Sequence, residues 1–178
     1  MAPAVITRPP DGQRELHMMR WGFPPYSIKG PPRITNVRHT GSSWWKPYLR
    51  PEFRCLVPVT SFCEYDWRTG NSVPTWFAID ESRPLFFFAG IWRSWRGVRG
   101  PQADPVESNH MLFSFLTTDA NDTVRPVHEK AMPVLLLDEQ ARETWMNAPM
   151  EEALLLQKPA ANDAVRIVSV GPREDGAP

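Results

Sequence analysis

Three polar residues in separate parts of the chain could together carry out proton chemistry: Asn36, Glu64 and His128. An amide, a carboxylate and an imidazole are the groups needed to hold and shuttle protons around an electrophilic carbon. The set contains no nucleophile, because the two cysteines, Cys55 and Cys63, both lie far from the N-terminus. The residue types therefore predict an acid/base site that lacks its attacking group.

Glu64 has the most telling surroundings of the three. It lies among Phe62, Tyr65 and Trp67, and partial desolvation by such neighbours raises the pKa of a carboxyl group. A carboxyl group with a raised pKa suits a general acid or base. The alternative is a solvent-facing strand residue that alternates with aromatic neighbours.

His128 follows Pro126 and precedes Pro133, in a loop between two apolar segments. A histidine held in this way could transfer protons or bind an oxyanion. The alternative is a histidine without a chemical role. Asn36 and Arg38 are two apart in an expected strand, so their side chains share a face. An amide beside a guanidinium reads oxyanions and phosphates, whereas the alternative is a loop amide and a solvated arginine.

No metal or cofactor site is expected. No Cys/His pair has the spacing of a zinc site, and no Gly-rich phosphate loop is present. The segment 92–99 interleaves Trp92 and Trp95 with arginines that include Arg93, as single-strand binders do. The tryptophans could equally belong to the core, with arginine stems packed over them.

Strands are the main elements expected to position these residues. Turn signals rich in Pro and Gly separate short apolar segments, which predict strands over residues 2–6, 16–23, 34–38, 53–59, 62–67, 75–80, 85–92, 111–117, 133–137 and 165–170. Residues 96–107 read as a loop. Helices are expected from the N-cap Asp138 to about Asn147 and over residues 150–157. The pattern predicts an α+β fold, a mostly antiparallel sheet core with a few peripheral helices.

The composition indicates one domain spanning residues 1–178, in which the tail over 172–178 is loose. No apolar run reaches the length of a membrane span, and two cysteines form no disulfide framework, so we expect a cytoplasmic protein without a membrane partner. Residues 1–100 hold 14 Lys and Arg against 7 Asp and Glu, whereas residues 101–178 hold 6 against 13. This asymmetry either marks one face for an anionic partner or mixes over the folded surface. The oligomeric state stays open.

Several segments, taken in order, resemble the SRAP family, the SOS response-associated peptidases that shield abasic sites in single-stranded DNA. The matching segments are Met19–Pro24, Asn36–Arg38, Phe53–Pro58, Phe62–Tyr65, Ala89–Trp92, Leu116–Asn121 and His128–Val134. Each is weak alone, but the ordered set over residues 16–137 is specific. The resemblance implies a barrel-like SRAP-type sheet and single-stranded DNA with abasic sites as the partner. It also implies association with the nucleoid when the protein is on DNA.

The resemblance also implies a mechanism. SRAP proteins begin Met-Cys, and self-removal of the Met exposes a Cys whose thiol and amine form a thiazolidine crosslink with the abasic aldehyde. Asn36 would position the thiol and sugar, Glu64 would act as general acid/base, and His128 would assist ring opening. The residues that the resemblance assigns to DNA are Arg38 at a phosphate, Trp21 with Gly22–Pro24 along the DNA path, and Thr117 as a further contact. Arg93, from the segment 92–99, is expected to contact DNA as well.

This chain departs from the family pattern at its start, Met1-Ala2-Pro3, which is similar to an internal family segment. We therefore expect it to be N-terminally incomplete. In Phe-Cys-Glu-Tyr, Cys63 stands beside Glu64, but strand neighbours point to opposite faces and an internal Cys has no α-amine. The alternatives are a non-catalytic single-stranded DNA-binding module that uses Arg38 and residues 92–99, and a peptidase acting in trans.

Overall fold

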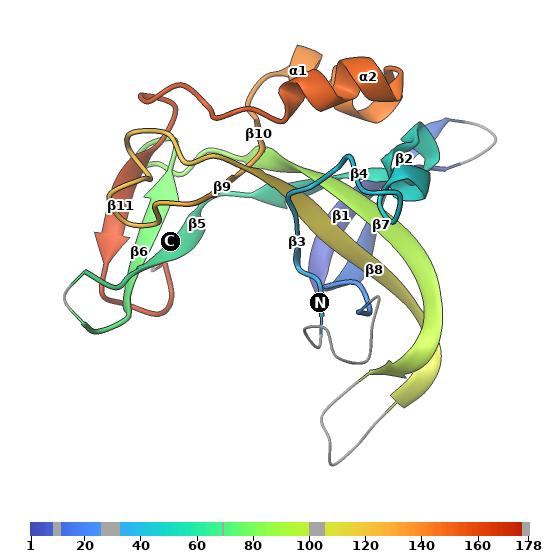
Figure 1. Cartoon of the computed structure of the whole chain (residues 1–178), viewed down its shortest axis with the longest axis horizontal. Helices are drawn as coiled ribbons and strands as arrows, with labels where there is room; N and C mark the ends of the chain where they lie inside the picture. The colour runs from blue at the N-terminus through green and yellow to red at the C-terminus, as the bar shows by residue number, and fades with distance from the viewer. Residues whose placement is uncertain (9–11, 26–32, 69, 100–105, 176–178) are drawn as a thin grey trace.

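A computed structural model describes residues 1–8, 12–25, 33–68, 70–99 and 106–175. Strands dominate, as the sequence predicts, and Figure 1 shows a barrel, a smaller sheet beyond one end of it and short helices along one side. The α+β fold class with a barrel-like core is confirmed. Among the described residues no helix is both long and apolar enough to cross a membrane.

Five strands close the barrel in the order β7-β4-β1-β2-β8, and β8 returns to β7. These strands are β1 (Ala2–Arg8), β2 (Gln13–Trp21), β4 (Arg54–Val59), β7 (Phe86–Arg99) and β8 (Val106–Thr118). The pairs are antiparallel except β2 with β8, which run parallel over only two residue pairs. Short β3 (Asn36–Val37) extends the sheet, in parallel with β8.

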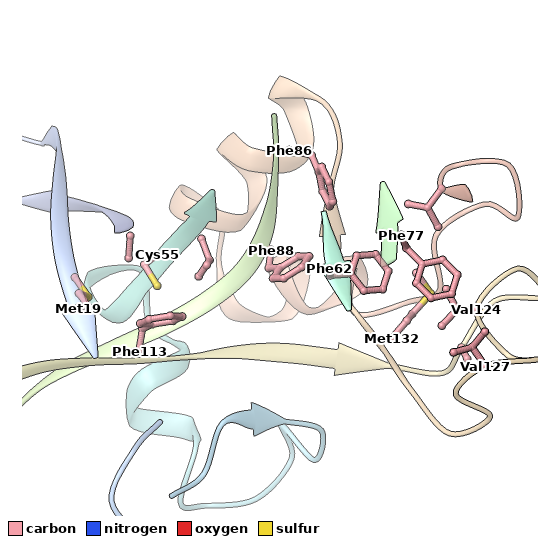
Figure 2. Packing of buried hydrophobic residues seen from close by; sticks show 14 of the residues in the cluster. Met19, Cys55, Phe62, Phe77, Phe86, Phe88, Phe113, Val124, Val127 and Met132 are labelled. Atoms are coloured by element: carbon pink, nitrogen blue, oxygen red, sulfur yellow. The ribbon is translucent and has the colours of Figure 1, made fainter. Parts of the chain in front are cut away.

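The second sheet has three antiparallel strands in the order β11-β6-β5. They are β5 (Phe62–Asp66), β6 (Val73–Ala78) and β11 (Arg166–Val170). Phe62 and Phe88 join this sheet to the barrel. Figure 2 shows them between two groups of core residues, with Met19, Cys55 and Phe113 on one side and Phe77, Val124 and Val127 on the other.

A second hydrophobic cluster lies under the helices, on the opposite face of the barrel strands. These helices are η1 (Lys46–Leu49), η2 (Pro51–Phe53), α1 (Glu139–Asn147), α2 (Met150–Ala153) and η3 (Leu154–Leu156). Asp138 caps α1, as expected, by accepting a 2.7 Å hydrogen bond from the Ala141 N–H. The fully buried Trp145 donates from its indole N–H to the carbonyls of Cys55 (3.0 Å) and Gly90 (3.1 Å), which fixes α1 to β4 and β7.

The loop expected over residues 96–107 was wrong at both of its ends. β7 continues to Arg99 and β8 begins at Val106, and they pair beyond the barrel as a two-stranded ribbon, for example Trp95 with His110. Charged residues suit this ribbon because the opposite strand satisfies the main-chain groups on its inner edge and water can satisfy those on its outer edges. Figure 1 shows the ribbon curving away from the barrel.

Two further expected elements are divided in the structure. Residues 133–137 contribute β9 (Met132–Pro133), which pairs with β8, and β10 (Leu135–Leu136), which pairs with β7. Val134 crosses between them, donating to Leu116 and accepting from Ala89. The expected helix over 150–157 is α2 followed by the tighter η3, which ends before Pro159.

Gly90 of β7 lies directly opposite Cys55 of β4. A Cβ at this position would meet the Cys55 Sγ at 2.6 Å and the Val57 Cγ2 at 2.9 Å. We therefore expect Gly90→Ala to lower the free energy of unfolding by about 1–3 kcal/mol through overpacking, measured by chemical denaturation. Adding Cys55→Ala removes the blocking sulfur, so the double variant should lose less stability than the two single losses combined. Additive losses would contradict this account.

Candidate functional site

A chain of aromatic rings runs from the end of β2 to β5. Trp21 stacks on Phe115 with ring centroids 5.4 Å apart, Phe115 contacts Phe88 at 5.0 Å, and Phe88 contacts Phe62 at 5.9 Å. Glu64 follows Phe62 by two residues in β5, so both side chains project from the same face. The rings thus connect the half-exposed indole of Trp21 with the neighbourhood of Glu64.

Glu64 is half-buried in β5, opposite Thr75 of β6. Burial raises the pKa of its carboxyl group, because a charged carboxylate loses solvation there, and attraction to His128 partly lowers the pKa again. His128 is therefore close enough to act on the charge of Glu64, although 64 positions separate the two residues. The structure brings together two of the three residues singled out for proton chemistry.

His128 lies in the loop between β8 and β9, and its ring is held from one side. Nδ1 lies 2.9 Å from the Ala131 carbonyl oxygen and 3.2 Å from the Ala131 backbone nitrogen. Nδ1 can donate to this carbonyl or accept from this N–H, depending on the tautomer. The backbone N–H of His128 also donates to Val124. The imidazole is thus oriented by main-chain groups rather than by another side chain.

The buried Asn121 anchors the start of this loop. Its amide donates to the carbonyls of Ala160 (3.2 Å) and Ala161 (3.1 Å), and its Oδ1 accepts from the Val124 N–H at 3.0 Å. Asn162 adds contacts with Asp122, which hold the two segments together. These bonds fix the turn whose last residue is His128.

Asn36 is exposed in β3 and pairs with Phe115 of β8, so its side chain shares a face with that ring. Trp21 fixes the segment before it by donating from its indole N–H to the Thr35 carbonyl at 3.0 Å. Asn36 and Trp21 therefore both lie beside Phe115. The aromatic chain links them to the Glu64 side of the site.

Arg38 and Thr117 flank the same region, and Gln157 connects their main chains. The Gln157 amide donates to the carbonyls of Arg38 (2.9 Å) and Thr117 (3.0 Å), while its Oε1 accepts from Thr40 at 2.8 Å. Thr117 is buried at the end of β8 and pairs with Pro133. The guanidinium of Arg38 forms an ion pair with Asp119.

Gly22 and Pro24 lie where the chain leaves β2. Gly22 has a φ of 99°, a conformation that favours glycine, and its N–H donates to Phe113 at 2.8 Å. Phe23 then bridges to Ile34 through two 2.9 Å hydrogen bonds. Pro24 is half-buried just after this bridge. The turn places Phe23 beside Ile34, two residues before β3.

Arg93 is not brought to this group. It pairs with Leu112 in the β7–β8 ladder and packs over Tyr48 of η1, donating to the phenol oxygen at 2.7 Å. Phe113 and Phe115 belong to the other face of β8. Trp92 and Trp95 pack against the two core clusters, which favours the core interpretation of these tryptophans.

The sequence predicted no role for three residues that make direct contacts at the site: Phe115, Asp119 and Gln157. Phe115 reads as an ordinary strand residue, and Gln157 bonds main-chain groups that leave no side-chain signal. Asp119 belongs to the family-like segment 116–121, but its partner Arg38 is 81 positions away. Within the described part of the chain no three His, Cys, Asp or Glu side chains gather as metal ligands would.

Comparison with known proteins finds similar chains. The chain is similar to the abasic site processing protein YoqW of Bacillus subtilis, 28% identical over 152 residues that make up 80% of this chain and 62% of that protein. It is similar to YobE, an abasic site processing protein of the same bacterium, at 26% identity over 154 residues, 80% of this chain and 64% of that protein. The chain thus spans less than two thirds of the length of these relatives.

Solved structures share the fold. A protein from Bordetella bronchiseptica has a TM-score of 0.70 at 25% identity, covering 96% of this chain and 82% of that one. A protein from Bacteroides thetaiotaomicron has a TM-score of 0.69 at 23% identity, covering 93% and 71%. The model of the family described as SOS response associated peptidase (SRAP) matches residues 1–173. The chain therefore belongs to the SRAP family.

Proposed function

We propose that this protein recognises abasic sites in single-stranded DNA through the site formed by Asn36, Glu64 and His128. The observation that carries the proposal is that the half-buried Glu64, whose pKa is raised, is attracted by His128, whose ring is held by main-chain groups. Such a pair suits proton transfer at an aldehyde carbon, the group that an abasic site exposes. Family membership and the names of the curated relatives support the same substrate.

Each residue has a role that fits its place. Glu64 supplies or takes the proton as the aldehyde is attacked, and His128 takes the proton when the sugar ring opens. The exposed Asn36 amide binds the sugar. Trp21 offers a half-exposed ring on which a neighbouring base can stack, and Arg38 binds a flanking phosphate.

The crosslink of the SRAP family requires a thiol and an amine on one N-terminal residue. Residues 1–178 contain only Cys55 and Cys63. Cys55 is fully buried, and burial raises the pKa of its thiol. Burial also raises the pKa of the Cys63 thiol, which lies on the face of β5 opposite Glu64. We propose that residues 1–178 bind the lesion without a covalent bond.

Incubation of residues 1–178 with abasic and intact single-stranded oligonucleotides tests both statements. We expect fluorescence anisotropy to show tighter binding of the abasic strand and a denaturing gel to show no shifted band. A shifted band that disappears in Cys63→Ala would contradict the non-covalent prediction. Salt-dependent binding that is equal for both strands would instead favour a DNA-binding module without lesion chemistry.

A further inference from the structure

The guanidinium of Arg38 binds a carboxylate through one terminal nitrogen, and its other terminal nitrogen is buried. Its Nη2 donates to the Asp119 carboxylate, whereas its buried Nη1 has no hydrogen-bond partner among the described residues. The Arg38 carbonyl is held by Gln157, so the base of the side chain is fixed in place. A phosphate must therefore bind this guanidinium at Nη2, the donor that Asp119 holds, because Nη1 is buried.

The Asp119 carboxylate is bound only weakly by the Arg38 guanidinium. Its side chain is 77% exposed, against 33% for Arg38. An ion pair this exposed contributes little, because water competes for both charges. The carboxylate can therefore leave at little cost when a phosphate takes its place on the guanidinium.

We propose that Asp119 occupies Arg38 in place of a nucleic-acid phosphate and must be displaced when a strand binds. Asp119 then lowers the affinity of the site for every strand that engages Arg38, intact or abasic, by the same factor. A bound strand must recover this loss through other contacts, such as those at Trp21 and Asn36. The proposal rests on the proposed function, because it requires that Arg38 binds DNA phosphate.

The competing account is that Asp119 positions Arg38 for the phosphate. The two accounts predict opposite signs for Asp119→Asn, which keeps the shape of the side chain and removes its charge. Displacement predicts that binding of both oligonucleotides tightens by about 2–5-fold, the range that an exposed ion pair allows, with the abasic-to-intact ratio unchanged. Positioning predicts that binding weakens.

The experiment measures the Kd of wild type, Asp119→Asn, Arg38→Met and the double variant for intact and abasic single strands at one fixed salt concentration. Asp119→Asn should have no effect in the Arg38→Met background, because the competed donor is gone. Asp163→Asn removes an equal charge from an exposed turn and is the matched control.

Unchanged or weaker binding by Asp119→Asn, or an equal gain from Asp163→Asn, would overturn the inference while the proposed function stands. If neither wild type nor Asp119→Asn binds either oligonucleotide, both the proposed function and the inference fail. If Asp119→Asn binds and wild-type binding is too weak to measure, the inference is supported, because the competing carboxylate then explains the weaker binding of the wild type.

Discussion

Replacement of Arg54 by Ala is expected to lower the free energy of unfolding by about 3 kcal/mol, measured by chemical denaturation. Arg54 is 1% exposed, and its guanidinium donates to the carbonyls of Leu49 (2.7 Å), Trp145 (2.8 Å) and Ala148 (2.7 Å). The last two carbonyls belong to the C-terminal end of α1, where the helix itself provides no donors. The guanidinium also lies over the Trp145 ring, 5.3 Å from its centroid.

Burial is the opposing effect at Arg54. It lowers the pKa of the guanidinium, while the carboxylates of Glu52 and Glu151 raise it. Loss of the charge therefore returns part of the desolvation cost, but it leaves three carbonyl acceptors without their donor. Arg50→Ala is the matched control, since Arg50 is exposed beside η2, and we expect its effect to stay within about 0.5 kcal/mol. An Arg54→Met variant as stable as wild type would show that the hydrogen bonds contribute nothing net.

Replacement of Glu64 by Gln is expected to remove most of the chemistry of the site while leaving DNA binding in place. Free cysteine supplies a thiol and an amine, which condense with an abasic aldehyde to a thiazolidine and release one water. We expect wild-type protein to accelerate this reaction on an abasic single strand, measured by the mass of the oligonucleotide. General acid/base groups typically contribute about 10²–10⁴-fold, so Glu64→Gln should fall close to the protein-free rate.

Glu139→Gln, in the exposed first turn of α1, is the control and should react as wild type does. A Glu64→Gln variant that binds the abasic strand and still accelerates the reaction fully would exclude Glu64 as the acid/base group. A Glu64→Gln variant that loses binding as well would place Glu64 among the contacts to DNA.

The same substitution has an expected effect on stability, and its sign follows from the raised pKa of Glu64. Between the unfolded and the higher folded pKa, the native state binds more protons than the unfolded state, so stability falls as pH rises through that window. Glu64→Gln removes this loss. Its free energy of unfolding should therefore exceed that of wild type at neutral pH, and the advantage should shrink as pH falls below the window.

The sequence predicted the strands well where a run of apolar residues lies between turn residues such as Pro and Gly, as at residues 85–92. It misjudged residues 96–107, because a two-stranded ribbon in solvent needs no apolar pattern when the opposite strand satisfies its main chain. It did not predict η1 and η2, and the end of η1 is held by Arg54 of β4, which donates to the Leu49 carbonyl. The sequence also did not predict which strands, distant from one another in the chain, pair in the sheets.

The looseness expected for the tail from residue 172 stays a prediction. Pro172 accepts a 3.0 Å hydrogen bond from the Trp76 indole, and the half-buried Asp175 pairs with Arg83 at 3.0 Å and accepts from Ser61. Residues 176–178 lie outside the described residues.

The sequence by itself determined which chemical groups the protein has and which family pattern they follow. Asn36, Glu64 and His128 could be singled out because their types and local neighbours are set by adjacent residues. Only the tertiary structure decided which of them act on one another, because the pKa of Glu64 depends on burial and on His128 from a distant loop. It also decided that Asp119 holds Arg38. Electrostatic and hydrogen-bonded partners are chosen by distance in space, which the order of residues along the chain does not encode locally.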